Sequence, residues 1–234
     1  MLLTHILPFN EVERLNKYCD YLFVLGFWKQ ATLQKYRDMV GSKILMVDNG
    51  FYENRKSMEW NKLLDVARFV KATHIYLPDT EDMDTTLDLA NKYQTKEFKQ
   101  IIVLKGKTYK EWEESLDKVL RNNNLWDLLA IPNDRIASTY ELSEQARLNF
   151  IRTNFPKKTK RIMITGLFCP KFLPFYADWC EFCDTKAFVK MAYCNVHNMF
   201  EWNKKYIAEY YDIKLSSEQL KIFDEINEEL RKYK

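Results

Sequence analysis

Glycine and histidine are both scarce in this chain, which has five glycines and three histidines among 234 residues. Glycine adopts positive φ angles without strain, so a scarce glycine tends to occupy a position that other residues cannot. The Gly-x-Gly-x-x-Gly, Gly-x-x-x-x-Gly-Lys-Ser/Thr and Gly-x-Ser-x-Gly motifs are all absent. Their absence argues against Rossmann, P-loop and α/β-hydrolase chemistry. We interpret the isolated His5, His74 and His197 as structural residues.

Long apolar runs are absent as well. No stretch approaches the eighteen consecutive apolar residues of a membrane-spanning helix, so no membrane association is predicted. Residues 1–16 lack both a basic segment and an apolar core, and we expect no secretory signal peptide there. The five cysteines are an odd set in a chain of ordinary domain size. We therefore expect reduced thiols and a cytoplasmic location.

One cysteine pair, Cys180 and Cys183, has the spacing of a metal-binding motif. We predict a strand over this segment, and residues three apart in a strand point to opposite faces. No second such pair accompanies them, so the sequence predicts no metal site.

Charge is nearly balanced, with 36 basic and 33 acidic residues giving a net charge of +3. This balance permits a nucleic-acid partner if the positive charge is clustered, but does not demand one. Hydrophobic residues make up 47% of the chain, enough for the core of a full domain.

Eight short apolar runs alternate with segments of helical periodicity. Continuous apolar character is typical of parallel strands that are buried on both faces. The predicted strands are Leu3–Phe9, Tyr21–Leu25, Ile44–Val47, His74–Leu77, Ile101–Leu104, Leu128–Ile131, Arg161–Thr165 and Trp179–Cys183. The helical stripes begin near Trp60, Leu87, Trp112 and Tyr140, the last with Thr139 as N-cap.

This order predicts an α/β fold, specifically a (β/α)8 TIM barrel with a C-terminal helical extension. A doubly wound open sheet is the alternative. We place the barrel domain at residues 1–190 and the extension at 191–234, packed on the barrel exterior. Ser216 and Gln219 predict a capping box at the start of the final helix.

Three predicted strands are followed by an aspartate: Asp48, Asp79 and Asp184. In a barrel the carboxyl ends of the strands form the active face, and Gly50, Gly106 and Gly166 fall at the same face. Each aspartate alone could simply cap the next helix. Together they suggest a carboxylate pocket, in which paired carboxyls act as nucleophile and acid or base. An aspartate can attack an anomeric carbon to form a covalent glycosyl-enzyme.

Basic residues also follow the strand ends. We interpret five of them as candidate phosphate contacts around the pocket, with an ordinary solvated surface as the alternative: Arg55, Lys107, Arg135, Lys171 and Lys186. The basic run over residues 157–161 precedes a strand, so we expect it at the opposite end of the barrel.

Five strand-end motifs occur in one order: Val47-Asp48-Asn49-Gly50-Phe51-Tyr52-Glu53, Leu77-Pro78-Asp79, Val103-Leu104-Lys105-Gly106, Ile164-Thr165-Gly166-Leu167 and Cys183-Asp184-Thr185. Over residues 20–190 the chain resembles the tRNA-guanine transglycosylase superfamily, in particular its small phage-type members that include DNA 7-deazaguanine transglycosylases. The resemblance implies a TIM barrel that exchanges guanine in a polynucleotide for a 7-deazaguanine such as preQ₀. For a phage protein it implies the host cytoplasm.

The resemblance also implies residue roles. Asp184 would be the nucleophile, Asp48 the general base and Asp79 the residue that binds the base edge. The resemblance places Tyr52 as a stacking aromatic and the backbone of Gly166 and Leu167 at the exocyclic groups of the base. Further substrate contacts are expected from four residues: Asn49, Gly50, Lys105 and Gly106.

Two features depart from the family pattern. Lys105 stands where the family often has glutamine, and the cysteine-rich zinc motif of most tRNA-acting members is absent. We therefore expect no zinc and no other cofactor, and a DNA substrate is favoured over tRNA. Two alternatives remain at this stage: another carboxylate-dependent TIM-barrel glycosidase or lyase, and a non-catalytic nucleic-acid-binding barrel. The oligomeric state is not predicted.

Overall fold

Eight parallel strands form the centre of the molecule. The computed structural model describes residues 1–133, 137, 139–157, 161–199, 202 and 210–233. The strands are β1 Leu2–His5, β2 Leu22–Leu25, β3 Leu45–Asp48, β4 His74–Tyr76, β5 Lys99–Val103, β6 Leu128–Ile131, β7 Ile162–Ile164 and β8 Phe182–Thr185. They are hydrogen-bonded in the order β1-β8-β7-β6-β5-β4-β3-β2, and every pair is parallel.

The ring closes between β1 and β2 through irregular contacts rather than a regular ladder. The Asp20 amide donates to the Leu3 carbonyl over 2.9 Å, and the Asp20 carboxylate accepts from the Leu3 amide over 2.9 Å. The Thr4 hydroxyl donates to the carbonyl of Tyr21. The predicted (β/α)8 TIM barrel is therefore confirmed, and the open sheet is excluded.

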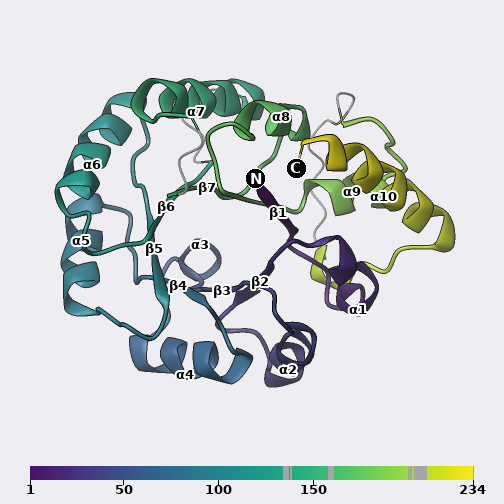
Figure 1. The fold of residues 1–234 in the computed structure, drawn as a ribbon, viewed down its shortest axis with the longest axis horizontal. Helices are drawn as coiled ribbons and strands as arrows, with labels where there is room; N and C mark the ends of the chain where they lie inside the picture. The colour runs from purple at the N-terminus through teal and green to yellow at the C-terminus, as the bar shows by residue number, and fades with distance from the viewer. Residues whose placement is uncertain (134–136, 138, 158–160, 200–201, 203–209, 234) are drawn as a thin grey trace.

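Helices surround the strands (Figure 1). The α-helices are α1 Val12–Leu15, α2 Gln30–Met39, α3 Phe51–Asn54, α4 Trp60–Val70, α5 Met83–Lys92, α6 Tyr109–Arg121, α7 Tyr140–Asn154, α8 Leu173–Tyr176, α9 Ala187–Tyr193 and α10 Ser217–Leu230. Short 3-10 helices are η1 Asn16–Tyr18, η2 Pro170–Phe172, η4 Tyr210–Asp212 and η5 Arg231–Tyr233.

The predicted helical stripes are largely buried against the sheet. In α6, Trp112 and Val119 are fully buried, but Leu120 is 43% exposed. Leu120 points outward because it lies one 100° step beyond Val119. The predicted N-cap of α7 is confirmed by a 3.2 Å bond from the Leu142 amide to the Thr139 hydroxyl. Within the described residues, no helix combines the length and apolarity needed to cross a bilayer.

The C-terminal segment packs beside β1 and α1 (Figure 1). The predicted capping box starts α10, with both reciprocal Ser216–Gln219 bonds present. From α10, Asn227 lies 2.9 Å from the His5 ring nitrogen, and the Phe223 ring lies 5.0 Å from that of His5. The predicted boundary between residues 190 and 191 falls inside α9, and buried residues on both sides belong to one hydrophobic cluster.

The expected strand at Trp179–Cys183 begins later, at Phe182. Cys180 therefore precedes the strand and only Cys183 lies in it. The prediction that both cysteines lie in one strand was wrong. Both thiols are buried and unpaired. Burial raises the pKa of Cys180 to about 12, which makes its thiolate unavailable at neutral pH.

Candidate active site

Helix α3 crosses the mouth of the barrel at the carboxyl ends of the strands. Figure 1 draws it inside the ring of strands. At its start, the Phe51 ring lies 4.9 Å from the ammonium of Lys105, which follows β5. Two residues later, the charge of Glu53 acts on the carboxyls of Asp48 in β3 and Asp184 in β8. The helix therefore joins two sides of the mouth.

Gly50 makes this crossing possible. Its φ of +76° is in the left-handed region, and a Cβ atom there would lie 2.6 Å from the Phe27 ring. Both facts demand glycine at this position. The Gly50 amide donates to Asp48 Oδ1 over 2.6 Å, so the turn also fixes the carboxyl that ends β3.

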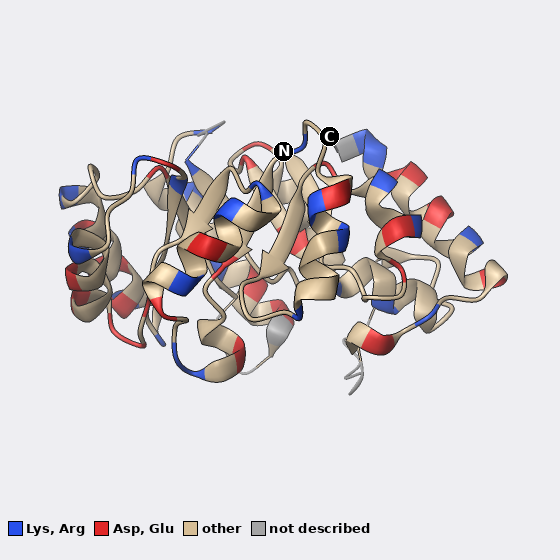
Figure 2. Ribbon diagram, turned by 90° about the horizontal axis from the view of Figure 1, so that it is seen from below, with Lys and Arg blue, Asp and Glu red and all other residues tan. Residues whose placement is uncertain are grey.

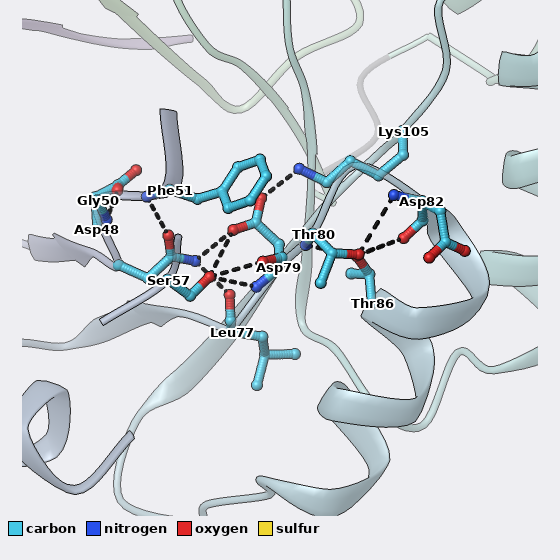
Figure 3. Close-up of polar contacts among 11 residues, drawn as sticks. Asp48, Gly50, Phe51, Ser57, Leu77, Asp79, Thr80, Asp82, Thr86 and Lys105 are labelled. Carbon is cyan, nitrogen blue, oxygen red and sulfur yellow. Dashed lines mark hydrogen bonds and ion pairs between the residues drawn. The ribbon is translucent and has the colours of Figure 1, made fainter. Parts of the chain in front are cut away.

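Asp79 is the centre of a hydrogen-bonded network on the β3–β5 side (Figure 3). Its Oδ1 accepts from Asn49 Nδ2 at 2.9 Å and lies 3.2 Å from the Ser57 hydroxyl, and its Oδ2 accepts from Lys105 Nζ. The same Asn49 amide group donates to the Leu77 carbonyl at 2.6 Å. We call Asn49, Ser57, Asp79 and Lys105 the Asp79 network.

The Asp79 network contains a buried ion pair. The side chains of Asp79 and Lys105 are 5% and 10% exposed. A buried carboxylate and a buried ammonium each lose hydration, so the pair persists only because each charge compensates the other.

Asp184 is held on the opposite side of the mouth by two backbone amides. The Gly166 amide donates to Asp184 Oδ1 at 2.7 Å, and the Leu167 amide donates to the Asp184 carbonyl at 3.1 Å. Gly166 has φ +64°, which aims its amide at the carboxyl. These two amides orient Asp184 in this structure, and the contacts to a base that the resemblance implies for Gly166 and Leu167 stay a prediction.

Burial raises the pKa of both chemically interesting carboxyls. The pKa of Asp184 rises to about 6, and the Gly166 hydrogen bond limits the rise. Burial, followed by the charge of Glu53, raises the pKa of Asp48 well above its usual range, and Asp79 and Asp184 add to the effect. Asp48 nevertheless remains partly exposed. Both carboxyls therefore hold their protons to higher pH than an ordinary aspartate does.

Lys186 lies inside this acidic group. Its ammonium is 4.5 Å from the centre of the Tyr211 ring, and its pKa is lowered by burial against the opposing effects of Glu53, Asp184 and Asp48. The Tyr211 hydroxyl is buried and makes no hydrogen bond with any described residue. We call Asp48, Glu53, Asp184, Lys186 and Tyr211 the Asp184 cluster.

Several predicted contacts lie elsewhere. Tyr52 is 68% exposed, with Arg55 5.6 Å above its ring. Phe51, not Tyr52, is the aromatic side chain beside the Asp79 network (Figure 3). The Gly106 carbonyl accepts a hydrogen bond from the Trp112 indole N–H at 3.1 Å. A Cβ atom on Gly106 would collide with the Trp112 ring.

The predicted phosphate contacts fall into three groups. Arg55 and Lys107 are exposed, and Lys171 forms a 2.7 Å ion pair with Glu141. Lys186 is half-buried in the Asp184 cluster, which makes it a partner of carboxylates. Arg135 lies outside the described residues. Figure 2 shows basic and acidic residues interspersed over the helices.

The opposite end of the barrel has its own cavity, of about 460 Å³. Arg161 lines it together with Lys99, Asp127 and Glu181. Arg161, the last residue of the basic run at 157–161, thus lies at the predicted end. Residues 158–160 lie outside the described part.

Sequence reasoning missed Phe51, Glu53 and Ser57 as site residues. Phe51 and Glu53 stand in the quoted motif after β3, but only the orientation of α3 shows which of its residues face the mouth. Ser57 carried no signal, because its contact with Asp79 depends on the path of the loop after α3.

In the described ranges, no three His, Cys, Asp or Glu side chains come together as a metal site would require. No protein-family model matches the chain, and no curated protein is significantly similar to it.

Proposed function

We propose that this protein is a base-exchange transglycosylase, which replaces guanine in a polynucleotide, preferably DNA, with a 7-deazaguanine such as preQ₀. The observation that carries the proposal is the pairing of two carboxyls at one barrel mouth: Asp184, whose pKa rises to about 6, and Asp48, whose pKa is raised well above its usual range by burial and the charge of Glu53. Two carboxyls with separated pKa values supply a nucleophile and a proton donor at the same pH. The strand-end motifs supply the substrate class.

Asp184 begins the proposed reaction as a carboxylate. It attacks C1′ of the nucleotide, and the bond from C1′ to N9 of guanine breaks as the ester forms. The electron pair passes to N9, and protonated Asp48 donates the proton that this nitrogen needs. Asp48 is then a carboxylate and takes the N9 proton of the incoming base. That nitrogen attacks C1′ and releases Asp184.

The Asp79 network suits the edge of a guanine-type base. A carboxylate offers about four acceptor positions, and Asn49, Ser57 and Lys105 occupy three of them. The remaining position on Oδ2 can accept an N–H of the base. The Lys105 ammonium has three donors, so it can also donate to the carbonyl of the base. A donor edge beside a carbonyl is the pattern that guanine and its 7-deaza analogues share.

The test is base exchange by the purified protein. Single-stranded DNA, duplex DNA and tRNA are each incubated with labelled guanine or preQ₀, and label in the polymer is counted. We expect incorporation into DNA, and a covalent protein–DNA adduct that survives denaturing electrophoresis. Incorporation only into tRNA would identify tRNA as the substrate and would leave the proposed reaction unchanged.

No label in either polymer and no adduct would reject the proposal. Release of a sugar from an oligosaccharide under the same conditions would favour a carboxylate-dependent glycosidase. Binding of DNA with neither reaction would favour a non-catalytic barrel. The matched control is Asp117→Asn, which changes an exposed carboxyl on α6.

A further inference from the structure

A fully buried arginine lies behind the Asp184 cluster. Arg147, on α7, is 0% exposed and ranks among the largest completely buried side chains. A guanidinium without water needs both a counter-charge and partners for its N–H groups. Glu144 supplies the charge, with Oε2 at 2.6 Å from one terminal nitrogen and 3.1 Å from Nε. Arg147 is therefore stable where it lies.

Glu144 is itself fully engaged. Its Oε2 also accepts from the Tyr176 hydroxyl at 2.8 Å. Its Oε1 accepts from Asn133 Nδ2 at 2.6 Å and from the Phe168 amide at 3.0 Å. Hydrogen bonds thus hold the Arg147–Glu144 pair in place beneath the loops that follow β6 and β7.

The other terminal nitrogen of Arg147 faces the active rim. It donates to the Ile131 carbonyl at 3.2 Å, at the end of β6, and to the Thr165 carbonyl at 2.8 Å, just after β7. The neutralisation of the charge by Glu144 does not require these two bonds. They tie two neighbouring strand ends to one side chain.

The Thr165 carbonyl and the Gly166 amide belong to the same peptide group. In a planar trans peptide these two groups point in opposite directions. Arg147 holds the carbonyl end, and the amide end donates to Asp184 Oδ1 at 2.7 Å. A cation at the carbonyl polarises the peptide and strengthens its N–H as a donor. One peptide group therefore links the guanidinium to the carboxyl.

We propose that Arg147 is a positioning residue for Asp184, acting through the peptide group between Thr165 and Gly166. It fixes the plane of that peptide, and so the direction of the Gly166 amide, and it keeps the carboxyl ionised and aimed. The link to catalysis rests on the proposed transglycosylase function, whereas the link to the state of Asp184 does not. The charge of Arg147 and the Gly166 bond both act to lower the pKa of Asp184.

The first test follows the wild-type protein, with one variant used only to assign a signal. Because the chain has five glycines, selective ¹⁵N-glycine labelling gives five amide signals. The signal that Gly166→Ala removes is that of Gly166. We expect the Gly166 amide proton to shift with pH at a midpoint of about 6, in step with the Asp184 carboxyl followed by ¹³C NMR. A Gly166 signal that does not titrate with Asp184 would overturn the proposal.

The second test changes Arg147. Removal of the arginine alone would leave the buried Glu144 carboxylate without its counter-charge. The main variant is therefore the double substitution Glu144→Gln with Arg147→Gln. We expect the pKa of Asp184 to rise on the order of one unit above its wild-type value. Arg147→Lys keeps the charge but loses the fork that reaches two carbonyls. It should give a smaller rise and a displaced Gly166 signal.

Arg152→Gln is the matched control on the same helix. Arg152 lies over the rings of Phe175 and Trp179, and no hydrogen bond from it to the Thr165 peptide is found among the described residues. It should leave the titration unchanged. Circular dichroism and urea unfolding establish that each variant is folded. A folded double variant in which Asp184 titrates as in wild type would refute the role of Arg147.

Activity measurements separate the proposed transglycosylase function from the proposed role of Arg147. If the wild type exchanges bases, the acid limb of its kcat profile should move upward in the double variant by the same amount as the Asp184 titration, with KM changing less. If the wild type does not exchange bases, the proposed transglycosylase function is rejected. The NMR titrations still test whether Arg147 positions Asp184. A kcat profile that keeps its acid limb in a folded double variant would contradict the role of Arg147.

Discussion

The Asp79 network and the Asp184 cluster stabilise their carboxyls in opposite ways. In the Asp79 network, both oxygens of Asp79 have donors and an ammonium neutralises the charge. In the Asp184 cluster, Asp48 and Asp184 each receive one backbone amide, and both have raised pKa values because burial is not offset. The first arrangement stabilises one geometry. The second holds two carboxyls with raised pKa values.

This difference predicts opposite consequences for mutation. A change in the Asp79 network should cost stability, because it leaves a buried charge without its partner. A change at Asp184 should cost activity and increase stability, because the fold already sustains an unfavourable buried charge there. The variants below test whether the two sides divide in this way.

The largest effect is expected for Asp184→Asn on base exchange. The amide cannot act as a nucleophile, so we expect a loss of at least about 10⁴-fold in kcat and no covalent adduct. Asparagine keeps an oxygen in place for the Gly166 amide, so the fold should persist. The measurement is single-turnover incorporation of labelled base. An adduct formed by this variant would assign the nucleophile to another residue.

Lys105→Met should have the largest effect on stability. It leaves Asp79 buried with its charge uncompensated, and we expect a loss of about 3–5 kcal/mol in the free energy of unfolding. Urea denaturation measures it. Lys118→Met is the control, since Lys118 pairs with Asp84 over 2.7 Å at the surface and should contribute about 1 kcal/mol or less. Equal losses would mean that the Asp79 pair behaves as a surface pair.

The sequence predicts the fold of this protein more completely than it predicts the candidate site. The eight strands followed from their apolar runs, because strands covered on both faces have no polar alternation to obscure them. The start of β8 was misplaced since Trp179, although apolar, belongs to the preceding loop. Asp48, Asp79 and Asp184 were placed at the active rim by one rule, that the carboxyl ends of parallel strands share a face.

Orientation and long-range contacts were not predictable. Phe51 and Tyr52 are adjacent, and only the rotation of α3 decides which one faces the Asp79 network. Lys186 resembles any rim lysine until η4 brings Tyr210 and Tyr211 over it from more than twenty residues away. The role of Arg147 depends on two distant carbonyls, that of Ile131 at the end of β6 and that of Thr165 just after β7. These arrangements are set by tertiary packing, which no local pattern encodes.

Asp184→Asn should also raise stability at neutral pH. The folded-state pKa of about 6 lies above the ordinary 3.8, so ionisation penalises the native state progressively from about pH 4 to 6 and fully above that. The difference corresponds to about 3 kcal/mol, which the uncharged variant should gain at pH 7. Urea unfolding at pH 7 and pH 4 measures it, and the gain should fall to about 0.5 kcal/mol at pH 4. A gain that is equal at both values would point to packing instead of charge.

The smallest effect separates the two aromatic residues of α3. If the incoming base stacks beside the Asp79 network, Phe51→Ala removes the ring that faces it, and stacking of a base on an aromatic side chain is worth about 1–3 kcal/mol. We expect KM for the base to rise about 10-fold with a smaller change in kcat. Tyr52→Ala, which trims an exposed ring one residue away, should change KM about two-fold or less. The reverse order would show that α3 turns when the base binds and that Tyr52 is the stacking residue, because only a rotation of the helix brings its ring to the Asp79 network.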